Sequence, residues 1–98
     1  MNITSTVENN TCTLSIEGRI DTLTAPQLEQ VFNENADKCD TMIFDLEKTE
    51  YITSAGLRVI LVAHREMEKK QGLVLKNLNR NVANIIKIIG FDKKIRIE

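Results

Sequence analysis

The chain has 98 residues, which allows one domain with a hydrophobic core and leaves little room for a separate active-site subdomain. Its 13 basic and 14 acidic residues are spread along the sequence and give a net charge of -1, so no positive field attracts nucleic acid or an anionic membrane. The longest apolar run, Val59 to Ala63, is far shorter than the ~20 residues that cross a bilayer. We therefore expect a single cytoplasmic domain over residues 1–98, with no direct nucleic-acid binding and no membrane insertion.

The first third of the chain predicts a hairpin and a helix. Apolar and polar residues alternate from Ile3 to Glu8 and from Thr11 to Glu17, on either side of an Asn9-Asn10 turn, which is typical of a β-hairpin with one solvated face. The segment Thr24-Ala25-Pro26-Gln27 supplies a capping hydroxyl, a proline in the first turn and a glutamine. These signals predict a first helix from about Ala25 to Ala36.

The rest of the chain alternates apolar strands with amphipathic helices. We expect a strand at Met42 to Leu46 and a second helix at about Ala55 to Lys70, closed by Gly72. A strand at Leu73 to Leu75 follows, and then a third helix capped by Gly90-Phe91, whose apolar stripe is Val82, Ile85, Ile86 and Ile89. The last expected element is a short strand at Ile95 to Ile97. The order β-β-α-β-α-β-α-β predicts an α/β domain. Its mixed sheet combines the N-terminal hairpin with parallel strands and is packed with helices.

Neither the cysteines nor the single histidine forms a catalytic or metal-binding pattern. Cys12 and Cys39 belong to no C-x-x-C pair, and we expect reduced structural thiols rather than a disulfide or a metal site. His64 follows Ser54 by ten residues in the same expected helix, ~15 Å along its axis, whereas a general base must come within ~3 Å of its nucleophile. We therefore expect no enzyme activity, no catalytic residue, no metal and no cofactor.

Two loops are expected at the same edge of the sheet. Functional loops of parallel sheets tend to lie beyond the carboxyl ends of the strands. The turns after Glu17 and after Leu46 both fall there, which brings Asp21 and the Thr53-Ser54 corner together. Asp21 has two interpretations, a carboxylate placed beside Ser54 and a turn residue that bonds its own backbone.

Ser54 and Gly56 also have two interpretations each. Ser54 stands where an extended segment turns into the second helix, so it is either an N-cap or a site where the helix end stabilises a phosphate. Gly56 costs ~1 kcal/mol of helix stability relative to alanine, which indicates either tight packing on the sheet or close access for a partner.

Landmarks along essentially the whole chain resemble those of the anti-sigma factor antagonists of the STAS family. They are Gly18-Arg19-Ile20-Asp21, Asp45-Leu46, Tyr51 to Leu57, Val82 and Gly90-Phe91. The most specific part, Thr53 to Leu57, is similar to the signature Asp-Ser-Ser-Gly-Leu, whose first serine accepts the phosphate and aligns with Ser54. The chain differs from the signature at Thr53 and Ala55, and Arg58 replaces the glycine that follows it.

The resemblance implies a partner and a switch. The partner would be an anti-sigma factor that is also a serine kinase; it would bind the unphosphorylated chain, and phosphorylation of Ser54 would end the binding until a phosphatase restored it. The expected partner-binding residues are Asp21, Thr22, Thr53, Ser54, Ala55, Gly56 and Arg58. The alternative is a constitutive STAS interaction subunit of a transporter or signalling assembly, without a phosphoswitch. We expect a monomer or a weak dimer.

Overall fold

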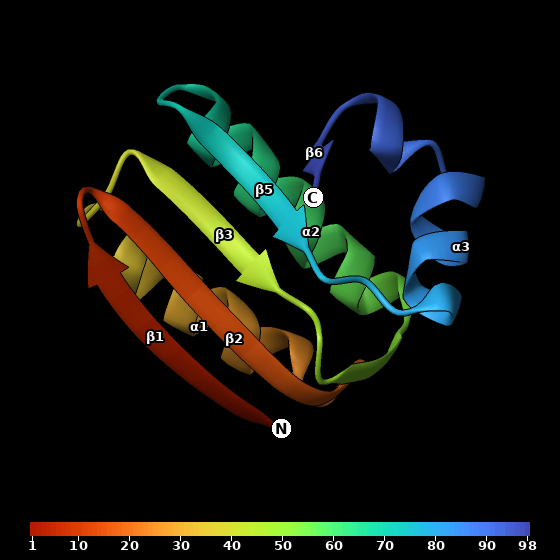
Figure 1. Cartoon of the computed structure of the whole chain (residues 1–98). Helices are drawn as coiled ribbons and strands as arrows, with labels where there is room; N and C mark the ends of the chain where they lie inside the picture. Colours follow the sequence, from red (N-terminus) through yellow and green to blue (C-terminus); the bar gives the residue numbers. More distant parts are fainter.

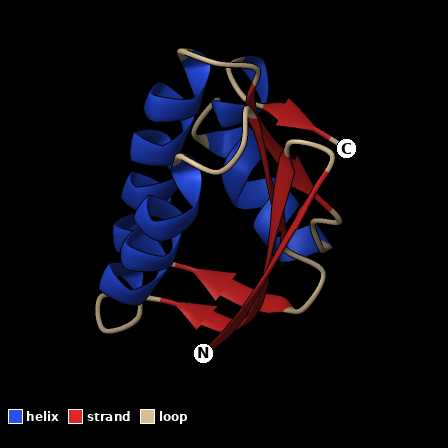
Figure 2. Ribbon diagram, turned by 90° about the vertical axis from the view of Figure 1, so that its left-hand side faces the viewer, coloured by secondary structure: helices blue, strands red, loops and turns tan.

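A six-stranded mixed sheet carries helices on one of its faces (Figure 1; Figure 2). The computed structural model describes residues 1–98. The strands are β1 (Asn2–Glu8), β2 (Thr11–Ile20), β3 (Thr41–Asp45), β4 (Thr49–Ile52), β5 (Gly72–Lys76) and β6 (Arg96–Ile97). The helices are α1 (Ala25–Ala36), α2 (Ser54–Glu68), α3 (Arg80–Ile88) and the short 3-10 helix η1 (Phe91–Lys93).

The α/β fold with a mixed sheet is confirmed. β1 and β2 form the antiparallel hairpin, and β2, β3, β5 and β6 follow one another as parallel neighbours. α1 has the bounds expected from its sequence, whereas α2 begins one residue earlier than expected and ends at Glu68. No helix combines the length and the apolar composition that a membrane crossing requires.

The expected order of elements lacked one strand. Residues Thr49–Ile52 form β4, which pairs in parallel with the last part of β2 after a register shift at Gly18/Arg19. From the sequence alone, only an extended segment before Ser54 is expected here, and no strand. Its strand character depends on the pairing with β2, more than thirty residues away in the sequence, and no local alternation announces it.

The core lies between the sheet and the helices that cover it. Alternate residues of β2 and β3 are buried under the helices, except at the half-buried Gly18. Phe32 of α1 meets Phe44 of β3 edge to face at a centroid distance of 6.2 Å. Cys12 and Cys39 belong to this core as free thiols, as expected. Burial raises the pKa of the Cys12 thiol to about 11, so the thiol is neutral at physiological pH.

Candidate functional site

The carboxyl ends of β2 and β4 lie side by side and bring the two expected loops together. Ile20 is the strand partner of Ile52, and the backbone amide of Thr53 donates to the carbonyl oxygen of Ile20 at 2.9 Å. Asp21 and Thr53 are the next residues along each chain segment. The expectation that Asp21 and the Thr53-Ser54 corner share one edge is therefore confirmed.

Ser54 is the first residue of α2, and its side chain is exposed. The expectation that it is the N-cap is wrong, because Thr53 holds that position in an extended conformation with φ -91° and ψ 176°. The Thr53 hydroxyl donates to the carbonyl oxygen of Ile20 at 3.3 Å and caps no helical amide. The Ser54 hydroxyl makes no hydrogen bond and lies at the N-terminal end of α2, where unpaired backbone amides and the helix dipole give a positive potential.

Gly56 belongs to the packing of α2 on the sheet and has no access to solvent for a partner. It is buried, and a Cβ at this position would lie 2.6 Å from Cγ2 of Ile20 and 2.8 Å from Cγ2 of Ile52. Because real Cβ atoms do not come that close to other carbons, only glycine lets the first turn of α2 approach this closely. The packing interpretation of Gly56 therefore holds, and its place among the partner-binding residues stays a prediction.

Asp21 is a turn residue. Its Oδ1 accepts hydrogen bonds from the backbone amides of Leu23 and Thr24, both at 3.0 Å, and no hydrogen bond joins it to Ser54. The pKa of the Asp21 carboxyl is below its ordinary value. The hydrogen bond from the Thr24 amide is the largest cause, and the bond from Leu23 and the nearby charge of Arg19 act in the same direction. Thr24, expected to cap α1 with its hydroxyl, instead accepts from the Asp21 amide and donates to the Arg19 carbonyl, both at 2.8 Å.

A groove of about 210 Å³ runs between α1 and α2 next to this edge. Its walls combine apolar and charged side chains. They are Thr22, Ala25, Pro26 and Glu29 on one side and Ala55, Arg58, Val59 and Val62 on the other. Three of the expected partner-binding residues, Thr22, Ala55 and Arg58, thus line one hollow, and Ser54 immediately precedes Ala55. This arrangement places the exposed Ser54 hydroxyl next to a groove that contains both apolar and charged side chains.

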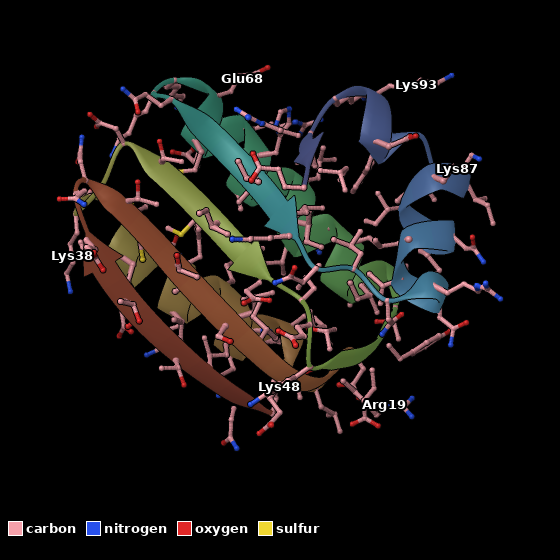
Figure 3. The ribbon with its side chains drawn as sticks, in the orientation of Figure 1. Arg19, Lys38, Lys48, Glu68, Lys87 and Lys93 are labelled. Atoms are coloured by element: carbon pink, nitrogen blue, oxygen red, sulfur yellow. The ribbon has the colours of Figure 1, made fainter.

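Two exposed apolar residues lie at the same edge and were not among the residues expected from the sequence. Leu23 is 90% exposed, and Tyr51 is 44% exposed with the Arg19 guanidinium 5.4 Å from its ring centroid. Figure 3 shows Arg19 at this end of the molecule. The available signal was a leucine inside the polar turn Asp21 to Thr24, where it fits neither the strand alternation nor the stripe of α1.

His64 lies on α2 and its imidazole Nε2 is 3.7 Å from a carboxylate oxygen of Glu68. Its side chain is 13% exposed. It makes no hydrogen bond to Ser54. The Ser54 hydroxyl therefore has no imidazole base beside it.

The sequence and the fold of this chain are similar to those of known proteins. Residues 2–98 match the family model of the STAS domain. The anti-sigma-F factor antagonist RsfB of Mycobacterium tuberculosis is 33% identical over 101 residues, which cover 97% of this chain and 80% of RsfB. An anti-sigma factor antagonist from Mycobacterium paratuberculosis has a crystal structure with a TM-score of 0.90 and 25% identity, over 98% of this chain and 83% of that one.

The fold is shared more widely. The structure of Bacillus SpoIIAA in its phosphorylated form matches with a TM-score of 0.76 at 18% identity, over 99% of this chain and 91% of that one. At this level of identity the similarity concerns the fold alone. Taken with the family model and RsfB, these findings show that the chain belongs to the STAS domain family, among the anti-sigma factor antagonists.

Proposed function

We propose that this protein binds an anti-sigma factor with serine-kinase activity while Ser54 is unphosphorylated, and that phosphorylation of Ser54 ends the binding. The observation that carries the proposal is the exposed Ser54 hydroxyl, free of hydrogen bonds, at the start of α2 beside the groove. The kinase transfers the γ-phosphoryl group of ATP to Oγ of Ser54, and ADP and the hydroxyl proton leave.

The position of Ser54 explains how a phosphate changes the surface without unfolding the domain. A dianion at a helix N-terminus is stabilised by the unpaired amides and the helix dipole. Arg58 is exposed and follows Ser54 by four residues in α2, so the two side chains share one face of the helix. A phosphate on Ser54 attracts the Arg58 guanidinium and withdraws it from a partner that binds along the groove.

The binding surface comprises the solvent-accessible residues of the edge. Thr22, Ala55 and Arg58 line the groove, and Thr53 and Ser54 form the corner at its end. A phosphatase that hydrolyses the Ser54 phosphomonoester returns the surface to its binding state. The proposed cycle takes place in the cytoplasm and involves no catalytic group of this chain.

The test combines binding with mass measurement. The purified chain is mixed with each anti-sigma factor kinase of the same organism, with and without ATP. We expect a complex without ATP, a mass gain of about 80 Da with ATP, and loss of the complex as the mass rises. Ser54→Ala removes the mass gain and keeps the binding.

The other serines provide the matched control. Ser5 is exposed on β1, so Ser5→Ala keeps both the mass gain and its effect on binding. Binding that never responds to ATP, with no mass gain, overturns the switch and supports the constitutive interaction subunit. Failure of the unmodified chain to bind any anti-sigma factor overturns the proposed function as a whole.

A further inference from the structure

Leu23 is the most exposed large apolar side chain of the protein, at 90%. It lies in the turn between β2 and α1, and it contributes nothing to the core. Single exposed leucines are common on protein surfaces and need no explanation by themselves. What distinguishes Leu23 is the way in which its backbone is held and the surface that it adjoins.

The turn that carries Leu23 is fixed by side-chain hydrogen bonds. Asp21 Oδ1 accepts from the Leu23 amide at 3.0 Å and from the Thr24 amide at 3.0 Å. The Thr24 hydroxyl accepts from the Asp21 amide at 2.8 Å and thereby closes the turn from its other side. The backbone amide of Ala25, the first residue of α1, donates to the Asp21 carbonyl at 2.8 Å. Leu23 is therefore displayed in a defined position, and little backbone entropy remains to be lost when it is bound.

Leu23 stands directly beside the groove. Thr22, the residue before Leu23, and Ala25, two residues after it, both line the hollow between α1 and α2. The opposite wall contributes Val59 and Val62, so the surface consists of a projecting leucine next to an apolar depression. Arg58 and Glu29 add opposite charges to the two walls of that depression.

We propose that Leu23 is the anchor side chain through which this protein binds its anti-sigma factor, and that Asp21 is a positioning residue that holds the anchor in place. This inference rests on the proposed function. It also defines the chemistry of the partner surface, which has an apolar recess for Leu23, an apolar side chain that enters the groove, and charged groups opposite Arg58 and Glu29. Anchors of this kind dominate binding energy when they enter a desolvated pocket.

The first experiment measures the affinity of the anti-sigma factor for Leu23→Ala. We expect binding about tenfold weaker or more, because truncation empties the partner's recess. Ile88→Ala is the matched control, since Ile88 is 83% exposed on α3 and outside the groove. Its affinity should stay within about twofold of the wild type. Both residues are exposed, so neither substitution should lower the melting temperature.

The second experiment separates positioning by Asp21 from direct contact. Asp21→Asn keeps an Oδ1 acceptor for the Leu23 amide and loses the charge, whereas Asp21→Ala loses both. We expect the affinity of Asp21→Asn to stay within about threefold of the wild type, and the affinity of Asp21→Ala to fall about tenfold. Hydrogen exchange of the Leu23 amide should remain slow in Asp21→Asn and become fast in Asp21→Ala.

Several outcomes overturn the inference. If the wild type binds and Leu23→Ala binds equally well, the anchor is wrong while the proposed function stands. If Asp21→Asn weakens binding as much as Asp21→Ala while the Leu23 amide stays protected, Asp21 contacts the partner and does not act through the turn. If sedimentation shows a dimer that Leu23→Ala dissociates, the leucine serves self-association. If the wild type binds no anti-sigma factor, the proposed function fails and this inference fails with it.

Discussion

The Cα of Gly56 packs so closely on Ile20 that a Cβ would lie 2.6 Å from the Cγ2 methyl of that residue. Ile20 is the last residue of β2 and is fully buried, so the contact fixes the start of α2 directly over the end of the strand. The same contact keeps Ser54, two residues earlier, at the edge that also carries Asp21. A glycine that weakens the helix thus determines where the proposed switch residue stands.

We expect Gly56→Ala to destabilise the fold. Alanine gains about 1 kcal/mol of helix propensity, but overpacking of a buried contact typically costs about 1–3 kcal/mol. Ile20 and Ile52 are both core residues with branched side chains and have little freedom to move. We therefore expect a net loss of about 1 kcal/mol in the free energy of unfolding, measured by urea denaturation with an unchanged m-value. An increase in stability would show that the two isoleucines give way.

Ser54→Asp should leave the fold intact and weaken partner binding. A carboxylate in the first turn of a helix is stabilising by about 0.3–1 kcal/mol, so the melting temperature should stay the same or rise slightly. Affinity for the anti-sigma factor should fall about tenfold or more, because the added charge occupies the end of the groove and attracts Arg58. Ser5→Asp on β1 is the control. Equal affinity of Ser54→Asp and the wild type would contradict the switch.

Arg58→Glu should lower partner affinity by about tenfold with little change in stability. Arg58 is exposed and lines the groove, and substitutions at such surface positions usually change stability by no more than about 0.5 kcal/mol. Arg65→Glu provides a matched control, since Arg65 is exposed on the same helix but lies outside this groove. If both variants lose affinity to the same degree, the effect is one of net charge and the interface lies elsewhere.

The stability of the fold should decrease from pH 9 upward in a manner that depends on Cys12. Burial raises the pKa of this thiol from 9.0 to about 11, so an unfolded chain releases its proton before the folded one does. The contribution of Cys12 is therefore fully present below pH 9 and is lost as the pH rises towards about 11. Urea denaturation at several pH values should show a steeper decline for the wild type than for Cys12→Ala. Parallel declines would mean that other groups cause the loss.

The elements that could be predicted without the structure are those whose signals are local in the chain. The alternation around Cys12, Leu14 and Ile16 predicts β2, and the cap, proline and apolar spacing at Thr24 to Phe32 predict the bounds of α1. Alternation and helical spacing arise because one face of a strand or helix is buried. This burial leaves its pattern in neighbouring residues whichever element covers the face. The same local reading, with the resemblance of Thr53 to Leu57, located the candidate site at Ser54.

Features that depend on contacts between distant residues became visible in the folded protein. β4 is a strand because β2 pairs with it, and Gly56 is a packing residue because Ile20 lies beneath it. Asp21 serves its own turn, and that turn displays Leu23 beside a groove formed jointly by α1 and α2. The bonds of Asp21 are local, and the structure selects one of the two interpretations that the sequence left open. The pairing of β4, the packing of Gly56 and the groove depend on distances between atoms far apart along the chain, which the pattern of neighbouring residues does not contain.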